Sequence, residues 1–313
     1  GQETVTADGI KKILACNIGS PNDVANALEH DAEAIGLFRS EFLFMDAAEL
    51  PSEEEQFQAY RKVASALKGA PVIIRTLDVG GDKEIPYLHM EKEENPFMGF
   101  RAVRYCLENA DQYKVQLRAL LRAGAFGDVK IMIPLVTCVE EVRAVKALVE
   151  ECKAELEAEG LKYDENIEVG VMMETPAASL IADKLAEEAD FFSIGTNDLI
   201  GYTMCADRGN DHISNLYQVY YPAVLRSIKN IIESGVKAGI MVGMCGEAAA
   251  DPLLEPLLIS FGLEEFSMSA PSILRARKTI SQWSKAECDE LAEKALACTT
   301  AAEVKALLEA AAR

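Results

Sequence analysis

The sequence predicts a single (β/α)8 barrel with extra helices at its carboxyl end. Eight short apolar runs alternate with longer segments whose apolar residues recur at helical spacing. The 313 residues contain no linker, low-complexity tract or break in composition, which favours one domain spanning 1–313. Within it, we place the barrel at about 10–283 and two outer helices at 284–313. A doubly wound open sheet is the structural alternative, but the count of eight favours a barrel.

The predicted strands are rich in β-branched and aliphatic residues, as expected of parallel strands that are buried on both faces. In chain order they lie at about 12–18, 34–39, 71–77, 129–136, 167–174, 190–196, 240–246 and 264–269. Each is followed by a stretch that can return the chain to the start of the next strand. This regular alternation is what predicts closure into a barrel.

The predicted helices show amphipathic spacing and recognisable start signals. The clearest helices are Glu53 to Leu67, Gln112 to Leu121, Val139 to Leu156, Ala177 to Ala189, Ala223 to Val236 and Pro271 to Trp283. Ser20 and Ser52 each stand where an N-cap is expected, next to a proline and ahead of acidic residues. From Lys285 onwards the pattern predicts two more helices, packed outside the barrel.

The composition limits the possible partners and the compartment. Thirty-one Lys and Arg against 51 Asp and Glu give a formal net charge of −20, which argues against nucleic acid or anionic lipid as a partner. The eight Cys form no Cys-x-x-Cys pair, so we expect reduced thiols in a cytoplasmic protein. The amino terminus has no signal-peptide pattern, and no apolar run approaches the ~20 residues that a membrane helix requires.

Charged and polar residues follow several of the predicted strands at their carboxyl ends. They are Arg39 after the second strand, Arg75 and the Gly80-Gly81 pair at the third, Glu174 after the fifth, Asn197, Asp198 and Arg208 after the sixth, and Cys245 after the seventh. In a (β/α)8 barrel these positions converge on one face, where active sites lie. Each residue also has a structural interpretation: an arginine in an ion pair, a carboxylate that satisfies it, or a thiol that only packs.

The residue types that converge here suit a particular chemistry. Arginine forks bind phosphate or carboxylate groups bidentately. Two carboxylates on neighbouring strands, with room for water and substrate oxygens, suit Mg²⁺ or Mn²⁺. A protonated thiol nearby could deliver a proton to carbon. The sequence therefore points to phosphoryl transfer or to enolate chemistry, in which positioning and charge stabilisation supply most of the catalysis.

Seven segments resemble the C-terminal phosphoenolpyruvate-binding domain of enzyme I of the bacterial sugar phosphotransferase system. They are GLFRSEFLFM at 36–45, RTLDVGGDK at 75–83, NPFMGFR at 95–101, ETPAA at 174–178, SIGTNDL at 193–199, DRGN at 207–210 and CGE at 245–247. The resemblance runs from about residue 10 to about residue 280. The DRGN segment looks like enzyme I rather than its relatives pyruvate phosphate dikinase and phosphoenolpyruvate synthase.

The resemblance implies a role for each matching residue. Arg39, Arg75 and Arg208 would hold the phosphate of phosphoenolpyruvate, and Asn197, with the backbone at Asn197 and Asp198, would contact the substrate. Lys83 and Arg101 match motif positions too, where they would assist in binding or simply neutralise nearby carboxylates. Glu174 and Asp198 would bind Mg²⁺, or Mn²⁺ in its place. Cys245 would protonate the methylene carbon of the enolate to give pyruvate. It also implies a homodimer that forms through the barrel.

The same resemblance implies a phosphoacceptor histidine that this sequence does not contain. In enzyme I the phosphoryl group passes to a histidine in a Gly-Gly-x-Thr-Ser-His-type segment of an N-terminal domain, and from there to a small phosphocarrier protein. The only histidines here are His30, His89 and His212, and none lies in such a segment. We therefore expect this chain to be the isolated C-terminal domain of a longer protein, unable to complete the transfer alone.

Three other functions remain open at the level of sequence. The chain could be the catalytic barrel of a pyruvate phosphate dikinase or phosphoenolpyruvate synthase. It could be a non-catalytic module that senses phosphoenolpyruvate, in which case the metal-binding carboxylates are dispensable. A lyase of the aldolase type could use the same metal and enolate site, and would cleave a carbon–carbon bond without any phosphoacceptor.

Overall fold

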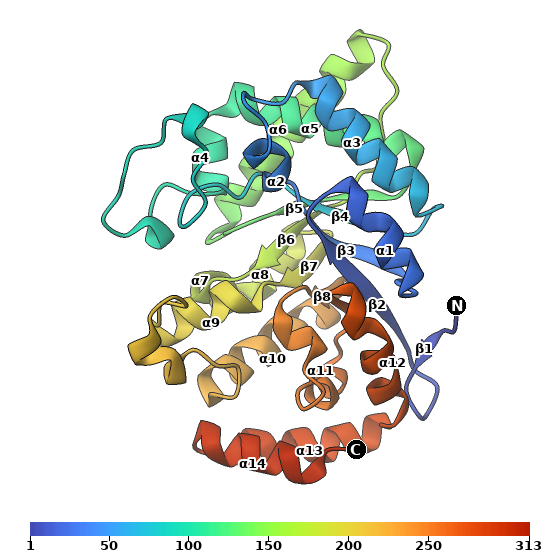
Figure 1. The fold of residues 1–313 in the computed structure, drawn as a ribbon, viewed down its shortest axis with the longest axis vertical. Helices are drawn as coiled ribbons and strands as arrows, with labels where there is room; N and C mark the ends of the chain where they lie inside the picture. Colours follow the sequence, from blue (N-terminus) through green and yellow to red (C-terminus); the bar gives the residue numbers. More distant parts are fainter.

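A computed structural model describes residues Gly1–Arg313, and its centre is a closed parallel β-barrel (Figure 1). The strands are β1 (Thr4–Val5), β2 (Lys11–Ile18), β3 (Ala34–Arg39), β4 (Val72–Arg75), β5 (Val129–Ile133), β6 (Val169–Met173), β7 (Phe191–Ile194), β8 (Met241–Met244) and β9 (Glu265–Met268). Strands β2 to β9 pair in sequence order, and the pairing of Ile13 with Glu265 joins the last strand to the first. The predicted (β/α)8 barrel and all eight of its strands are confirmed.

One short strand was not predicted. Strand β1 pairs antiparallel with β2, with Thr4 opposite Lys12, and extends the sheet outside the closed barrel. Two residues are too few to carry an alternating apolar pattern, so no sequence signal marks this strand. Its position is fixed instead by tertiary contacts, since Thr4 accepts a hydrogen bond from Nε of Arg277 in the last barrel helix at 3.0 Å.

The helices lie around the barrel on all sides. They are α1 (Val24–Glu29), α2 (Glu41–Met45), α3 (Glu53–Ala66), α4 (Val103–Glu108), α5 (Ala110–Ala123), α6 (Val139–Ala158), α7 (Pro176–Leu180), α8 (Ala182–Glu188), α9 (Thr196–Met204), α10 (Pro222–Lys237), α11 (Glu255–Phe261), α12 (Ile273–Ser281), α13 (Lys285–Ala297) and α14 (Ala301–Ala311). Seven short 3-10 helices occupy Pro21–Asp23, Pro86–Leu88, Pro96–Met98, Gly124–Phe126, Asp211–Leu216, Glu247–Ala250 and Ala270–Ser272.

The predicted outer helices and helix starts are confirmed. Helix α13 packs on α11, and α14 packs on α13, so both lie outside the barrel at the bottom of the view (Figure 1). The hydroxyl of Ser52 accepts a hydrogen bond from the backbone N–H of Glu55 at 3.1 Å and so caps α3. Ser20 accepts one from the N–H of Asn22 at 3.2 Å at the start of its short helix. These bonds satisfy backbone donors that a helix start leaves free.

One predicted helix is wrong in its continuity. The helix predicted from Ala177 to Ala189 is divided into α7 and α8 at Ile181, whose φ of −111° and ψ of 24° are not helical. The break follows a tertiary contact, because Nδ2 of Asn230 in α10 donates to the carbonyl of Ser179 at 2.7 Å. A carbonyl that accepts a hydrogen bond from another helix does not need a partner within its own helix, so the helix can break there. The spacing of apolar residues does not reveal such a contact.

The core has two layers that the strand pattern explains. A large apolar cluster lies between the strands and the helices, and a smaller one lies inside the barrel. The inner cluster consists of Leu37, Ile73, Met132, Met172, Phe191 and Cys245. Both faces of each strand are therefore buried, which is why the strands read as continuous apolar runs. No helix is both long and apolar enough to span a membrane, and the eight cysteines form no disulfide.

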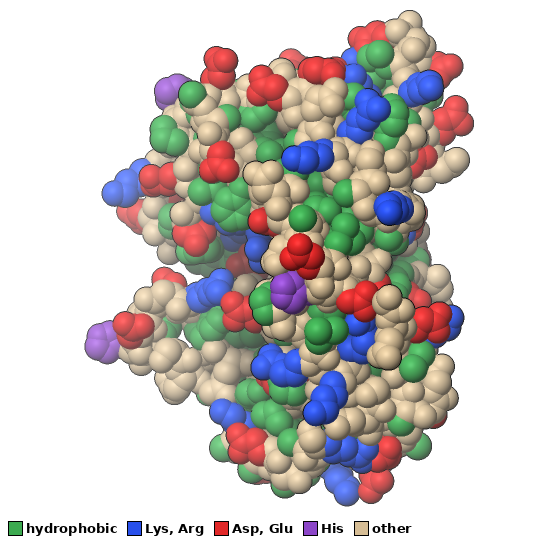
Figure 2. Space-filling view, turned by 45° about the vertical axis from the view of Figure 1, so that its right-hand side comes forward, with side chains coloured by type: hydrophobic (Ala, Val, Ile, Leu, Met, Phe, Trp, Pro, Cys, Tyr) green, Lys and Arg blue, Asp and Glu red, His purple; other side chains and the backbone are tan.

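The excess of acidic residues is spread over the outer helices. In α6, Glu155 accepts a hydrogen bond from Nη1 of Arg118 in α5 at 3.1 Å. The Nε of Arg118 also contacts Glu53 in α3 at 2.6 Å, so one arginine joins three neighbouring helices. On the face in Figure 2, acidic and basic side chains are interspersed. The negative net charge is therefore compatible with local ion pairing on the surface and with a cationic site at the barrel rim.

Candidate active site

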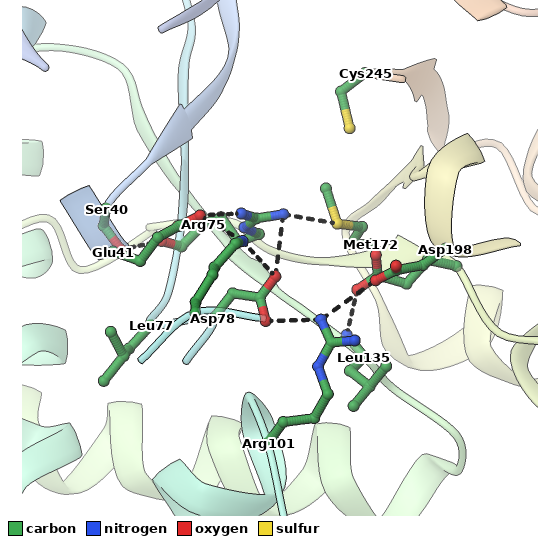
Figure 3. Close-up of polar contacts among 12 residues, drawn as sticks. Ser40, Glu41, Arg75, Leu77, Asp78, Arg101, Leu135, Met172, Asp198 and Cys245 are labelled. Carbon is green, nitrogen blue, oxygen red and sulfur yellow. Dashed lines mark hydrogen bonds and ion pairs between the residues drawn. The ribbon is translucent and has the colours of Figure 1, made fainter. Parts of the chain in front are cut away.

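The carboxyl ends of four barrel strands bring four of the predicted site residues to one rim (Figure 3). Arg75 is the last residue of β4, Glu174 directly follows β6, and Cys245 directly follows β8. Asp198 lies in the first turn of α9, which begins after β7. Because all barrel strands are parallel and in sequence order, their ends meet here without any further folding of the loops.

Arg75 is a buried cation held by two buried carboxylates. Its side chain is only 7% exposed, its Nη2 lies 2.6 Å from Oε2 of Glu41, and its Nη1 lies 3.4 Å from Oδ2 of Asp78. Burial alone would lower the pKa of the guanidinium, but Glu41 and Asp78 outweigh this and raise it. The Nε of Arg75 has no hydrogen-bond partner. One donor of the guanidinium therefore stays available.

Asp78 is the centre of the cationic cluster. Its Oδ1 accepts a hydrogen bond from Nη2 of Arg101 at 3.0 Å, and its Oδ2 lies 3.4 Å from Nζ of Lys83. Burial alone would raise the pKa of the Asp78 carboxyl, but the charges of Arg75, Lys83 and Arg101 together hold it well below its usual range. Asp78 therefore stays ionised and gathers three cations around one point.

Glu41 supports two of the same cations from the other side. Its carboxylate is fully buried, and Oε2 accepts both the Arg75 contact and a 2.8 Å hydrogen bond from Nζ of Lys83. The neighbouring Ser40 hydroxyl donates to the backbone carbonyl of Arg75 and accepts from Nε2 of Gln116 at 2.9 Å. The turn after β3 therefore fixes both the backbone and the side chain of Arg75.

The loop after β4 places Arg101 against the cluster. Gly80 has a φ of +100°, and a Cβ built there would lie 2.6 Å from Cβ of Arg101, so only glycine fits. The backbones of Gly80 and Lys83 exchange two hydrogen bonds of 3.1 Å, which closes a tight turn. The guanidinium of Arg101 also lies over the ring of Phe97, 5.5 Å from its centroid. The glycine pair seen in the sequence therefore permits close packing within the loop.

Glu174 and Asp198 form the acidic side of the site. Glu174 is buried, and its Oε1 accepts a hydrogen bond from the N–H of Leu135 at 2.7 Å. A Cβ at Gly195 would lie 2.9 Å from Oε2 of Glu174, so this glycine leaves room for the carboxylate. Burial raises the pKa of Glu174 well above its usual value, and the nearby charges of Asp198 and Asp78 raise it further. Asp198 contacts Nη2 of Arg101 at 3.3 Å.

Cys245 lies at the carboxyl end of the apolar cluster inside the barrel. It is buried, and its Sγ donates to the carbonyl of Ile194 at 3.6 Å. Burial raises the pKa of the thiol to about 11, although the charge of Arg75 acts in the opposite direction. In Figure 3 the thiol faces Arg75 and Met172, whose sulfur accepts a 3.6 Å contact from Nη1 of Arg75. The thiol is therefore protonated near neutral pH and lies beside the cationic cluster.

The other three predicted residues lie outside this network of contacts. Arg39 ends β3 in register with Arg75, but its side chain makes no ion pair or hydrogen bond. Asn197 precedes Asp198, and its backbone carbonyl accepts a 2.8 Å hydrogen bond from the hydroxyl of Tyr217. Arg208 is 60% exposed and pairs with Glu247 at 3.3 Å. The structure therefore brings Arg75, Lys83, Arg101 and Asp198 into one network and leaves Arg39 and Arg208 without a contact to it.

Comparison with known proteins assigns the family. The family described as "PEP-utilising enzyme, PEP-binding domain" matches residues 1–285, where PEP is phosphoenolpyruvate. The chain belongs to this family. Two curated relatives named phosphoenolpyruvate-protein phosphotransferase agree with the assignment. The one from Bacillus sp. (strain S) is 54% identical over 303 residues, and the one from Geobacillus stearothermophilus is 53% identical over 303 residues.

Each of these matches covers 97% of this chain but 52% of the relative, so the chain spans about half the length of the curated relatives it matches. Among solved structures, a citrate lyase from Burkholderia xenovorans LB400 superposes with a TM-score of 0.54 at 14% sequence identity. That alignment covers 96% of this chain and 92% of the other. At such low identity the likeness shows the shared barrel fold alone.

The residues of this PEP-binding domain fit a divalent cation between Glu174 and Asp198. Both side chains offer carboxylate oxygens, the ligands that Mg²⁺ and Mn²⁺ prefer. Burial is the main cause of the raised pKa of Glu174, and the crowded negative charges of Asp198 and Asp78 add to it. A cation there would relieve this crowding. No group of three or more His, Cys, Asp or Glu side chains is placed to hold a metal alone, so substrate and water would have to complete its coordination.

Sequence reasoning missed two residues that organise this PEP-binding domain. Glu41 and Asp78 lie inside the recognised segments but were assigned no role, although together they hold Arg75, Lys83 and Arg101. A signal for them was present, since Arg75 lies within a buried strand pattern and a buried charge requires a partner. Asp78 stands three residues after Arg75, the nearest acid downstream. The distant partner Tyr202, which accepts from Nη1 of Arg101 at 3.2 Å, had no such signal.

Proposed function

We propose that this chain binds phosphoenolpyruvate together with Mg²⁺ or Mn²⁺ and donates its phosphoryl group to a histidine on a separate domain, releasing pyruvate. This would be the first step of the sugar phosphotransferase system. The observation that carries the proposal is the cluster of buried Arg75, buried Arg101 and half-buried Lys83 beside the carboxylates of Glu174 and Asp198, at the rim of a barrel in the PEP-binding family.

The cationic cluster would bind the phosphate. Nε of Arg75 and Nε of Arg101 are buried without hydrogen-bond partners, so both guanidinium groups retain donors for an anion. Arg39 makes no ion pair and stands in register with Arg75 at the strand ends, where it can join the same phosphate. Arg208 is exposed and would reach the substrate from the loop after α9. Asn197 and the backbone at Asp198 would contact the rest of the substrate.

Glu174 and Asp198 would hold the divalent cation. When bound, the cation supplies positive charge to the substrate oxygens on which negative charge develops. Glu174 is fixed for this purpose, since Leu135 donates to one of its oxygens and Gly195 leaves room at the other. Metal binding would favour the ionised form of Glu174 and so oppose the raised pKa that burial imposes.

The reaction would consist of a phosphoryl transfer and a proton transfer. The bond between phosphorus and the enol oxygen breaks while a bond between phosphorus and the acceptor histidine nitrogen forms, which leaves the enolate of pyruvate. Cys245 would donate its proton to the methylene carbon of the enolate, giving pyruvate and a thiolate that regains a proton from solvent. Burial raises the pKa of Cys245 to about 11, so the thiol carries the proton that this step needs.

The acceptor would lie on a different domain. None of the three histidines His30, His89 and His212 makes a hydrogen bond or ion pair with a site residue. We propose the histidine-bearing N-terminal domain of the same parent protein as the immediate partner, and the small phosphocarrier protein as the next. We also propose a homodimer formed through the barrel, which sedimentation equilibrium of the chain would test.

Calorimetric titration with phosphoenolpyruvate, with and without Mg²⁺, tests the binding step. We expect binding that depends on the metal and that Arg75→Ala abolishes. Arg275→Ala is the matched control, because this arginine lies in α12 and makes no ion pair with a site residue. Binding that is independent of the metal, or that Arg75→Ala leaves unchanged in a folded variant, would contradict the proposal.

Supplying the histidine domain in trans tests the chemistry. We expect phosphohistidine and pyruvate in equal amounts, with Cys245→Ala slowing pyruvate formation by about 10²–10⁴-fold while affinity for phosphoenolpyruvate changes little. Binding without any transfer would support a sensing module instead. Cleavage of a carbon–carbon bond without an acceptor would support a lyase, and a requirement for a nucleotide-binding domain would support a dikinase or synthase.

A further inference from the structure

Asp198 has a single ion-pair partner, and the contact is weak. Nη2 of Arg101 lies 3.3 Å from Oδ2 of Asp198, and the same nitrogen also donates to Oδ1 of Asp78 at 3.0 Å. Charge-assisted hydrogen bonds between nitrogen and carboxylate are usually about 2.7–2.9 Å long. One shared nitrogen at a longer distance therefore neutralises Asp198 without binding it tightly.

Asp78 does not depend on Arg101 in the same way. Its Oδ2 also contacts Nη1 of Arg75 and Nζ of Lys83, each at 3.4 Å. Two cations therefore remain beside Asp78 when Arg101 turns away. Moving the guanidinium therefore breaks its contact with Asp198, which is partly exposed, and the 3.2 Å hydrogen bond from Nη1 to the hydroxyl of Tyr202.

The backbone at Arg101 is fixed, so only its side chain is free to move. The N–H of Ala102 donates to the carbonyl of Val79 at 2.9 Å, and Gly80 packs so closely against Arg101 that an added Cβ would lie 2.6 Å from Cβ of Arg101. Ala102 is fully buried and has a φ of +51° and a ψ of −125°, a region that residues other than glycine rarely adopt. Strain of this kind persists where the surroundings determine the conformation of a functional segment.

We propose that Arg101 and the divalent cation compete for the carboxylate of Asp198. Arg101 neutralises Asp198 through the ion pair with Oδ2 (Figure 3). A cation that binds this carboxylate would stand close to the guanidinium, and like charges so near repel each other. The guanidinium then rotates away from Asp198 about its fixed backbone, and its unpartnered Nε and released Nη2 turn to the phosphate of the substrate.

This inference deepens the proposed function and rests on its metal site. It makes Arg101 a substrate-binding residue that links the two binding events, because the guanidinium that leaves Asp198 becomes available to the phosphate. Metal and substrate would therefore bind with positive coupling. Arg101 stays charged throughout, because the guanidinium of arginine is not deprotonated in proteins.

Binding of Mn²⁺ alone, measured by electron paramagnetic resonance in the absence of phosphoenolpyruvate, tests the competition. We expect Arg101→Met to bind Mn²⁺ about tenfold more tightly than the unmodified chain, because the competing cation is gone. Lys83→Met is the matched control. It removes the same charge from the same cluster, but Lys83 contacts Glu41 and Asp78 and does not touch Asp198. Its affinity for Mn²⁺ should change by no more than about threefold.

The same variants should respond in the opposite direction to the substrate. With Mn²⁺ saturating, Arg101→Met should bind phosphoenolpyruvate at least about tenfold more weakly, because the released guanidinium is missing. A merely structural arginine would weaken both ligands together. That result, or equal tightening of Mn²⁺ binding by Arg101→Met and Lys83→Met, would overturn the proposal. Circular dichroism of each variant confirms that it is folded.

Asp198→Asn separates this inference from the proposed function. If Asp198→Asn loses Mn²⁺ binding but Arg101→Met binds Mn²⁺ no more tightly than the unmodified chain, the competition alone is wrong. If Asp198→Asn binds Mn²⁺ as well as the unmodified chain, the metal lies elsewhere, and both proposals fail. Loss of binding in Asp198→Asn with tightening in Arg101→Met supports both.

Discussion

Two buried ionisable residues, one at each end of the barrel interior, differ in whether they have a charged partner in contact. At the carboxyl end, Arg75 is surrounded by the carboxylates of Glu41 and Asp78. Nearer the amino end, Glu265 in β9 is also buried, but its Oε1 has no hydrogen-bond partner. Burial raises the pKa of Glu265 to about 7, against the opposing charge of Lys130. Arg75, Glu41 and Asp78 keep their charges by pairing, whereas Glu265 favours the neutral form.

The difference shows where the fold can support chemistry. Paired charges stay ionised and are aimed at the rim, where an anion and a cation can use them. The carboxyl of Glu265 fits instead into a space left by glycines, since a Cβ at Gly36 would lie 2.7 Å and one at Gly243 would lie 3.1 Å from its Oε1. A titrating group enclosed in this way affects stability and does not reach the rim. Four predictions test this contrast, from the largest expected effect to the smallest.

Arg75→Met should produce the largest loss of stability. It leaves Glu41 and Asp78 buried with one cation fewer, and breaking a buried ion pair costs about 3–5 kcal/mol. Urea denaturation at neutral pH measures the loss. The double variant Arg75→Met with Glu41→Gln should recover at least about 1 kcal/mol, because the unpaired charge is gone as well. No recovery would mean that packing, and not pairing, explains the effect.

Glu265→Gln should remove a pH dependence from stability. With a pKa near 7 in the folded state and about 4.5 unfolded, the carboxyl of Glu265 favours folding below about pH 4.5. This contribution is lost as the pH rises through about 7, and it amounts to about 3 kcal/mol at most. The variant stays neutral, so its free energy of unfolding should fall less between pH 5 and pH 8, by an amount on this order.

Urea denaturation across this pH range provides the measurement for Glu265→Gln. Glu264→Gln changes the exposed neighbour and is the matched control, which should keep the pH dependence of the unmodified chain. If Glu265→Gln and the unmodified chain give parallel curves of stability against pH, Glu265 is not the titrating group.

Gly36→Ala should destabilise the amino-end half of the interior by overpacking. The added Cβ would lie 2.4 Å from Oγ of Ser267 and 2.7 Å from Oε1 of Glu265, and such crowding costs about 1–3 kcal/mol. Thermal unfolding measures this. Gly209→Ala, where the nearest atom is Oδ1 of Asp207 at 3.6 Å, should change stability by less than about 0.5 kcal/mol. Equal effects at the two glycines would contradict the tight fit around Glu265.

Arg208→Ala should have the smallest effect on stability. Its guanidinium is 60% exposed and pairs only with exposed Glu247, and such surface pairs contribute about 0–1 kcal/mol. Affinity for phosphoenolpyruvate should nevertheless fall by about tenfold or more if Arg208 holds the phosphate as proposed. Calorimetry beside thermal unfolding gives both numbers. A stability loss as large as that of Arg75→Met would place Arg208 in the buried network.

The sequence predicts the barrel well because its strands obey a local rule. Val72, Ile73 and Ile74 are all buried, because both faces of a parallel barrel strand are covered. A short apolar run is therefore sufficient to mark β4. The division between α7 and α8 was not predictable, because it follows from the contact between Asn230 and Ser179, which lie 51 residues apart. Strand β1 likewise depends on a partner at Arg277. Local patterns identify elements, and distant contacts decide where they break.

The candidate site divides in the same way. Position at a strand end was enough to select Arg75, Glu174 and Cys245 as residues of one rim. It could not show that Arg101, from the loop after β4, reaches Asp198 in α9, because 97 residues separate them. Nor could it show that Arg39 lacks an ion pair while Arg75 has two. Side-chain pairing depends on loop geometry at Gly80 and Ala102, which strand periodicity does not encode.

The sequence by itself determined the order of strands and helices, the rim at which polar residues converge, and the residue types that suit phosphate and a divalent cation. These follow from apolar periodicity and from the parallel direction of the strands, which are local properties. Only the tertiary structure decided which cation faces which carboxylate, and which buried acid stays unpaired. Ion pairing and pKa depend on distances between segments far apart in the chain, so they exist only once the barrel has closed.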